Sequence, residues 1–182
     1  LLLAIGTPAA KIAKAASHCR GAPGRFQRLP LPQPFAVVVD YAHTPDALET
    51  VLTTARRLTR GRVAVLFGCG GERDRAKRPL MCTIAKRLAD VVVLTSDNPR
   101  DEDPEAILRE VESGMAGGAA HLRIPDRREA IHAVLDQAGP GDFVLLAGKG
   151  SETYQEIAGQ KRPFDDREIV REWAAAHPPH LQ

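Results

Sequence analysis

Three side chains of different charge lie close together in the five residues that follow an apolar run at 91–95. They are Asp97, Asn98 and Arg100, with Pro99 between the last two. Pro99 fixes its own φ and favours an extended conformation at the residue before it, so the directions of the neighbouring side chains are restricted. A carboxylate, an amide and a guanidinium held in this order can bind both an ammonium group and a carboxylate.

Two distant segments supply further groups of the same kinds. Arg73 offers a second planar guanidinium for a carboxylate, and Glu152 offers a second acceptor for an ammonium group. Gly148 allows a ligand to approach the backbone closely. Together with Asp97 and Arg100, these residues predict a site for a zwitterion, which means an amino acid. The alternative is that they are solvated loop charges joined in surface salt bridges.

A second polar group lies at residues 40–46, where the sequence is DYAHTPD. Thr44 and Pro45 are typical of a helix start, with Thr44 as the N-cap. Capping does not explain Asp40 or His43, which come at the end of an apolar run. We therefore interpret Asp40 and His43 as candidate ligand contacts, while noting that a single histidine is more often structural.

Several common catalytic motifs are not matched. A dinucleotide fingerprint needs a glycine where Arg73 stands, and a phosphate-binding P-loop needs one where Phe143 stands. No G-x-S-x-G elbow surrounds Ser151, and His43 has no metal-ligand partner at a suitable spacing. Cys69 has no base beside it in the sequence, so we interpret it as a packing residue. These departures disfavour a reductase domain, an independent ATPase and a metal centre.

Apolar runs alternate with amphipathic segments along most of the chain. The pattern predicts strands at 35–40, 62–68, 91–95, 120–125 and 142–148, and helices at 43–59, 79–90, 103–115, 126–138 and 162–176. This alternation predicts an α/β fold with a doubly wound, mostly parallel (Rossmann-like) sheet and helices on both faces. Ligands of such folds bind beyond the carboxyl ends of the strands, where the polar groups lie.

Details of three helices follow from single residues. Gly61 is expected to end the first helix, and Asp165 or Asp166 to cap the last one. In the helix at 79–90, the spacing of Leu80, Ile84 and Leu88 predicts one apolar face toward the core.

The composition indicates a globular protein, with 43% hydrophobic and 26% charged residues in a chain of 182. A net charge of +2 gives no reason to expect nucleic-acid binding. No apolar run reaches the roughly 20 residues that a membrane span needs. The cysteines, Cys19, Cys69 and Cys82, have no CxxC spacing, which suits reduced thiols in the cytoplasm.

Four stretches carry a resemblance to a known family: VVVDYAHTPDALE, FGCGGERDRAKRPLM, TSDNPRDEDP and AGKGSETYQ. In order and spacing they closely resemble the C-terminal domain of the Mur ligases, over residues 1 to about 175. Within that family they are similar to the members that add meso-diaminopimelate. The resemblance implies an ATP-dependent amide-bond ligase of peptidoglycan precursor synthesis, which adds meso-diaminopimelate to UDP-MurNAc-L-Ala-D-Glu.

The resemblance also implies roles for individual residues. It assigns contacts with meso-diaminopimelate to Arg73, Asp97, Asn98, Pro99, Arg100, Gly148 and Glu152, and it places Arg25, Asp40 and His43 near the nucleotide. It implies ATP and Mg²⁺ as cofactors, bound mainly by a central ATPase domain upstream. One departure is Ser151, which stands where the family usually has a histidine.

On this interpretation, residues 1–20 are the tail of the central domain, 21–34 are a linker, and 35–182 are the C-terminal domain. The expected partners are meso-diaminopimelate, the UDP-linked dipeptide and the upstream ATPase domain, with no nucleic acid or membrane. Two alternatives stay open. One is a catalytically silent amino-acid-binding fragment, and the other is a related ligase such as a folate polyglutamate synthetase.

Overall fold

The computed structural model describes residues 5–16, 18, 21–115 and 121–178. Within these residues, six strands form one twisted sheet in the order β1-β2-β6-β3-β4-β5. The strands are β1 (Gln27–Arg28), β2 (Ala36–Asp40), β6 (Phe143–Ala147), β3 (Val63–Phe67), β4 (Val91–Leu94) and β5 (His121–Arg123). Strands β2 to β6 pair in parallel, and β1 is antiparallel to β2. The predicted fold class is confirmed.

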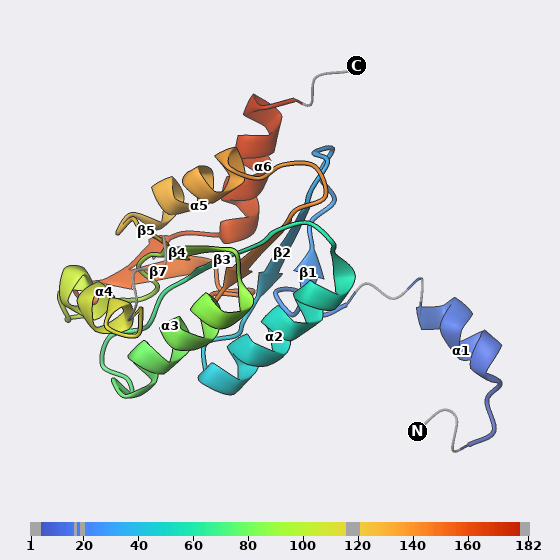
Figure 1. The fold of residues 1–182 in the computed structure, drawn as a ribbon, viewed down its shortest axis with the longest axis horizontal. Helices are drawn as coiled ribbons and strands as arrows, with labels where there is room; N and C mark the ends of the chain where they lie inside the picture. Colours follow the sequence, from blue (N-terminus) through green and yellow to red (C-terminus); the bar gives the residue numbers. More distant parts are fainter. Residues whose placement is uncertain (1–4, 17, 19–20, 116–120, 179–182) are drawn as a thin grey trace.

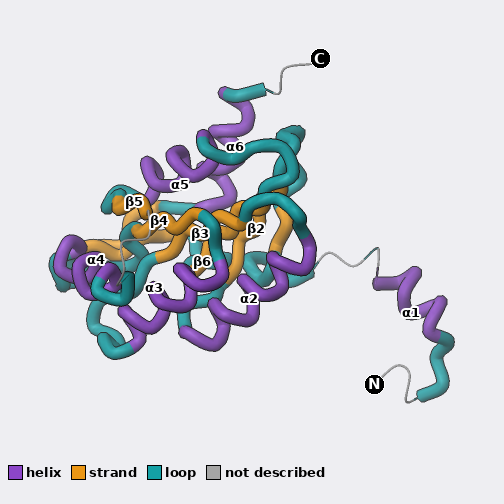
Figure 2. Tube along the Cα trace, in the orientation of Figure 1, coloured by secondary structure: helices purple, strands orange, loops and turns teal. Residues whose placement is uncertain are grey.

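Helices cover both faces of this sheet (Figures 1 and 2). One face is covered by α2 (Pro45–Leu58), α3 (Lys77–Leu88) and α4 (Pro104–Glu112), and the other by α5 (Arg127–Asp136) and α6 (Asp166–Ala176). Each face has its own buried apolar cluster. Because successive side chains of a strand point to opposite faces, Val38 belongs to one cluster and Val37 and Val39 to the other. This explains why the strands read as continuous apolar runs.

Aspartate or threonine side chains start four of the helices. Thr44 caps α2 and accepts a hydrogen bond from the Ala47 amide, and Pro45 is the first helical residue, as predicted. Asp103, Asp126 and Asp165 cap α4, α5 and α6 in the same way. Thr44, Asp103 and Asp126 lie in the connections between a strand of the sheet and the following helix. Each cap therefore fixes the end of a loop that leaves the carboxyl end of a strand.

Two details of the helices differ from the sequence-based expectations. The predicted apolar face of α3 is wrong at Leu80, which is 54% exposed, whereas Met81 and Ala85 are buried. Helix α3 lies between α2 and α4. The residues that it buries there include Met81 and Ala85, each one position after an expected residue, Leu80 or Ile84. Helix α2 ends at Leu58, before Gly61, because the chain there turns to pass the backbone of residue 141.

A short hairpin near the C-terminus was not predicted. It consists of β7 (Tyr154–Ile157) and β8 (Gln160–Pro163), paired antiparallel. Residues 162 and 163 therefore belong to a strand, and α6 begins at Asp166, later than the expected start at 162. The segment expected to be a linker, 21–34, contains β1. Helix α1 (Ala9–Ala16) has no buried residue and lies apart from the sheet (Figure 1). No described helix is long and apolar enough to span a membrane.

Candidate amino-acid-binding site

A cavity of about 330 Å³ lies beyond the carboxyl ends of the parallel strands. Its wall comes from the loops after β2, β3, β4 and β6, which are the four polar segments singled out in the sequence. The lining residues are Tyr41, His43, Thr44, Gly68, Gly70, Arg73, Asp74, Lys77, Asp97, Asn98, Arg100, Gly148 and Glu152. The structure thus brings together six of the seven residues expected to contact an amino acid. The seventh, Pro99, does not line the cavity.

Asn98 is held in one orientation by three hydrogen bonds. Its Oδ1 accepts from the Nζ of Lys149 and from the backbone amide of Glu156, each at 3.0 Å. Its Nδ2 donates to the Oε2 of Glu152 at 3.0 Å. Because both of its acceptor bonds come from obligate donors, the amide cannot be flipped without losing them. Asn98 therefore presents its NH₂ group toward Glu152 and the cavity wall.

Lys149 lies behind this wall and is fully buried. Its Nζ donates to the carbonyl oxygen of Tyr154 at 2.7 Å and lies 3.5 Å from carboxylate oxygens of both Asp97 and Glu152. Burial lowers the pKa of Lys149, and Asp97 opposes that shift. The Oδ1 atom of Asp97 is buried and accepts no hydrogen bond from the described residues. Lys149 was not among the residues predicted for the site, since a lysine in a Gly-rich loop is usually exposed.

Arg100 is positioned by the β7–β8 hairpin. Its backbone has a φ of +52°, in the left-handed region that is uncommon for arginine. The backbone amide of Arg100 donates to the carbonyl of Glu156 at 3.0 Å, and its carbonyl accepts from Ala158 at 2.7 Å. The guanidinium donates from Nη1 to the carbonyl of Gly71 at 2.7 Å, and its Nε lies 3.5 Å from Oε2 of Glu156. Contacts from two elements thus hold the side chain against the cavity.

Pro99 supports the site from outside the cavity. Its carbonyl oxygen lies so close to Gly71 that a Cβ there would come within 1.9 Å of it. The Gly71 amide also donates to the carbonyl of Asn98 at 2.9 Å. A glycine at 71 is therefore required for the loop after β3 to pack against the loop after β4.

A cluster of charges around the buried Arg78 fixes the loop that carries Arg73. Arg78 is fully buried and donates to Glu102 at 2.9 and 3.0 Å and to Glu110 at 2.7 Å. Glu102 also accepts from the backbone amide of Glu72 at 2.5 Å. The hydrogen bond from Arg78, followed by that from the Glu72 amide, lowers the pKa of Glu102 to about 2. Arg73 itself is exposed, and its Nη1 donates to the carbonyl of Glu72.

The three residues expected near a nucleotide lie at the end of β2. Both carboxylate oxygens of Asp40 accept backbone hydrogen bonds, from Phe26 at 2.6 Å and Ala42 at 2.7 Å. Asp40 does not line the cavity, and its carboxylate ties the segment before β1 to the strand. The guanidinium of Arg25 lies 4.4 Å from the ring centroid of Tyr41. Arg25 does not line the cavity either.

His43 is the member of this group that lines the cavity. Its Nδ1 is 2.8 Å from the carbonyl oxygen of Tyr41, and the two rings meet edge to face with centroids 4.6 Å apart. Lys77 donates from Nζ to the carbonyl of His43 at 2.7 Å. The ring of Tyr41, the imidazole of His43 and the ammonium group of Lys77 therefore form one side of the cavity. The loop after β4 forms the opposite side.

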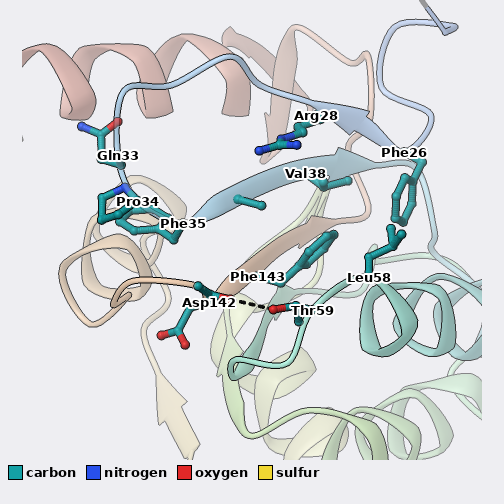
Figure 3. A pocket seen from close by; sticks show the side chains of 12 residues that line it. Phe26, Arg28, Gln33, Pro34, Phe35, Val38, Leu58, Thr59, Asp142 and Phe143 are labelled. Atoms are coloured by element: carbon teal, nitrogen blue, oxygen red, sulfur yellow. Dashed lines mark hydrogen bonds between the residues drawn. The ribbon is translucent and has the colours of Figure 1, made fainter. Parts of the chain in front are cut away.

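A second cavity, of about 520 Å³, lies near the first residues of β2 and β6, at the other end of the strands (Figure 3). Its wall is rich in apolar groups, including Leu58 and the rings of Phe26 and Phe143, whose centroids are 6.1 Å apart. The carboxylate of Asp142 in this wall already pairs with Arg62 at 2.6 Å. This cavity is larger, but it does not gather the groups that an amino acid would need.

The thiols give no sign of chemistry. Cys69 and Cys82 are buried and free. Burial raises the pKa of Cys69 to about 12 and that of Cys82 to about 11. The interpretation of Cys69 as a packing residue is consistent with this burial, and Cys19 lies outside the described residues.

Comparison with known proteins identifies the family. Residues 24–150 match the family described as "Mur ligase, glutamate ligase domain". The chain belongs to the Mur ligase family. It is 52% identical over 170 residues to a Geobacillus thermodenitrificans protein named UDP-N-acetylmuramoyl-L-alanyl-D-glutamate–2,6-diaminopimelate ligase, with 93% of this chain and 35% of the relative covered. A Chlorobaculum tepidum protein of the same name is 62% identical over 135 residues, with 73% and 26% covered.

Solved structures agree with the family assignment. A diaminopimelate ligase of that same name superposes with a TM-score of 0.82 at 45% identity, covering 96% of this chain and 38% of the other. A folylpolyglutamate synthase/dihydrofolate synthase from Yersinia pestis superposes with a TM-score of 0.55 at 16% identity, with 86% and 32% covered. The second likeness shows the shared fold alone. The Mur ligase chain described here spans about a third of the length of these relatives.

Proposed function

We propose that this chain is the amino-acid-recognising part of an ATP-dependent ligase that adds meso-diaminopimelate to UDP-MurNAc-L-Ala-D-Glu in the cytoplasm. The observation that carries the proposal is the composition of one cavity wall. Asp97 and Glu152 supply carboxylates there, while Arg73 and Arg100 supply guanidinium groups in the same cavity. The names of relatives that are about half identical to the chain support the same conclusion.

The chemistry of meso-diaminopimelate matches this wall. The molecule is lysine with an additional carboxylate at its distal end, so each end is a zwitterion. The carboxylates of Glu152 and Asp97 suit an ammonium group, and Arg100 suits the adjacent carboxylate. Gly148, at a φ of +113°, leaves room beside Asp97 that a side chain would occupy. Asn98 adds an NH₂ donor in a fixed orientation.

Selectivity against lysine follows from the same contacts. A ligand without the distal carboxylate cannot make the charge-assisted hydrogen bonds that Arg100 can offer in addition to its contacts with Gly71 and Glu156. A site that is built for a polar group rejects the analogue that lacks it by a factor on the order of 10⁴. We therefore assign the discrimination between meso-diaminopimelate and lysine to Arg100.

The proposed reaction forms an amide bond. ATP supplies the phosphoryl group that activates the γ-carboxyl of the D-glutamate, and the amine of diaminopimelate then replaces the phosphate. The residues of this chain bind and orient that amine and exclude water, which lowers the entropic part of the barrier. No group of three His, Cys, Asp or Glu side chains in the described residues is arranged to hold a metal ion, so no step is assigned to Mg²⁺ here.

Contacts with the nucleotide would come from the side of the cavity that the loop after β2 forms. His43 lines it, and Arg25 and Asp40 shape the segment beside it. We propose that this side faces the upstream ATPase domain, with the boundary between the domains at residues 21–34. Ser151 is exposed and does not line the cavity. Its replacement of the usual histidine is therefore expected to leave amino-acid binding intact.

The experiment is a comparison of two arginine variants by titration calorimetry with meso-diaminopimelate. Arg100→Ala is expected to lose binding while keeping the circular dichroism spectrum of the parent chain and a cooperative melting transition. Arg109→Ala is the matched control, because Arg109 is 60% exposed on α4 and pairs with Asp103 away from the cavity. Normal binding by a folded Arg100→Ala protein would overturn the proposed role of Arg100.

A further inference from the structure

Lys149 occupies a place in the site that the contacts with an amino acid do not explain. It is the second residue after β6, is fully buried and does not line the cavity. Its ammonium group nevertheless touches the groups that form the wall: the Oδ1 of Asn98 at 3.0 Å and one oxygen each of Asp97 and Glu152 at 3.5 Å. A charge in this position acts on a ligand through the wall without contacting it.

Two other cations near the wall, Arg127 and Arg100, already have carboxylates of their own beside them. Arg127 is paired with Asp166 at 2.7 Å in the buried layer behind the strand ends. Arg100 has Glu156 beside its guanidinium at 3.5 Å. Lys149 is therefore the internal counter-ion that faces the two carboxylates of the wall, Asp97 and Glu152. With Lys149 in place these three groups carry one net negative charge, which a single ligand ammonium can balance.

We propose that Lys149 is a positioning residue that sets the charge of the cavity wall, so that the cavity prefers a ligand end carrying an ammonium with a carboxylate over one carrying an ammonium alone. The proposal rests on the proposed function and extends it to a residue that the ligand does not touch. Lys149 acts in two ways. It keeps the wall from becoming doubly negative, which would repel the ligand carboxylate, and it holds the amide of Asn98 with its NH₂ group toward the cavity.

The substitution Lys149→Met tests the charge, because it keeps an unbranched side chain and removes the ammonium. The affinities for meso-diaminopimelate and for L-lysine would be measured by NMR titration of backbone amides, which reports weak and tight binding alike. Lysine carries one more net positive charge than diaminopimelate. Loss of a positive charge a few ångströms from the ligand should therefore lower the preference for diaminopimelate over lysine by about tenfold or more. A purely structural defect would weaken both ligands alike and leave the preference unchanged.

Two control variants separate charge from packing. Lys149→Arg keeps the charge, so the preference should be retained even where both affinities fall. Lys161→Met removes a lysine charge from the exposed face of the hairpin, where Nζ lies 4.5 Å from the centroid of the Tyr154 ring. That change alters the net charge of the chain by the same amount and should leave the preference unchanged.

A second background covers the case in which Lys149→Met does not fold. In Asp97→Asn a neutral amide replaces the buried carboxylate. Adding Lys149→Met then does not leave the Asp97 carboxylate buried without its counter-ion. The added substitution should still lower the preference for diaminopimelate by about the same factor. The role of Lys149 would be overturned if a folded Lys149→Met protein kept the parent preference for diaminopimelate over lysine. It would also be overturned if the double variant kept the preference of Asp97→Asn. A parent chain that does not prefer diaminopimelate to lysine would instead overturn the proposed function itself.

Discussion

Arg127 and Asp166 form a bidentate ion pair in which both side chains are completely buried. Nε of Arg127 donates to one carboxylate oxygen at 2.9 Å and Nη2 to the other at 2.7 Å. The same guanidinium donates to the carbonyl oxygens of Ser96 at 3.4 Å and Ala147 at 3.2 Å. These carbonyls immediately precede Asp97 and Gly148 in the sequence. The pair therefore ties α5 and α6 to the two strand ends that build the cavity wall.

Removal of one partner from this pair should be costly. Asp166→Ala leaves the Arg127 charge buried without compensation, and we expect the free energy of unfolding to fall by about 3–5 kcal/mol. Urea denaturation followed by circular dichroism measures this loss. Glu172→Ala is the matched control, since Glu172 is 60% exposed and pairs with Arg128 across the same two helices. The control should change stability by less than about 1 kcal/mol, and equal losses in the two variants would contradict the account.

Acid should weaken the fold through Glu102. Its folded-state pKa is lowered from 4.5 to about 2, chiefly by the hydrogen bond from Arg78. A group with a depressed pKa stabilises the folded state above its unfolded-state pKa, and this contribution is lost as the pH falls through the folded-state value. The free energy of unfolding is therefore expected to decrease between about pH 4.5 and pH 2. Urea denaturation across this range measures the decrease.

The substitution Glu102→Gln identifies the source of that pH dependence. The variant should be less stable than the parent chain at neutral pH, and its stability should change less between pH 4.5 and pH 2. Glu110, whose pKa is also lowered, chiefly by Arg75, would account for part of the dependence that remains. An unchanged pH profile in the Glu102→Gln protein would show that the buried Arg78 does not act through Glu102.

Much of the fold could be predicted because the strands are buried on both faces. Continuous apolar runs such as 35–40 and 142–148 are typical of parallel strands, and they were found within one residue of their expected bounds. The polar residues after these runs then had to meet at one edge, since parallel strands all end there. That is how Asp97 and Glu152, 55 positions apart in numbering, were expected in one site before any distance was known.

Other features depend on contacts that a sequence pattern does not contain. Arg78, Arg127 and Lys149 are charged residues that are normally exposed, and each is buried beside at least one acidic partner from a distant segment. The β7–β8 hairpin was missed because its second strand, at 160–163, is exposed and has no apolar alternation. Leu80 was misplaced because helical spacing gives the angle between residues, whereas the neighbouring helices decide which face is buried.

We propose that the cavity beyond the strand ends recognises the distal carboxylate of meso-diaminopimelate. The most direct measurement is calorimetric titration of the 182-residue chain with meso-diaminopimelate and, separately, with L-lysine. The account predicts saturable heat with diaminopimelate and an affinity for lysine that is weaker by a factor on the order of 10⁴. Equal affinities for the two ligands would contradict it, because the ligands differ in the carboxylate that Arg100 is proposed to bind.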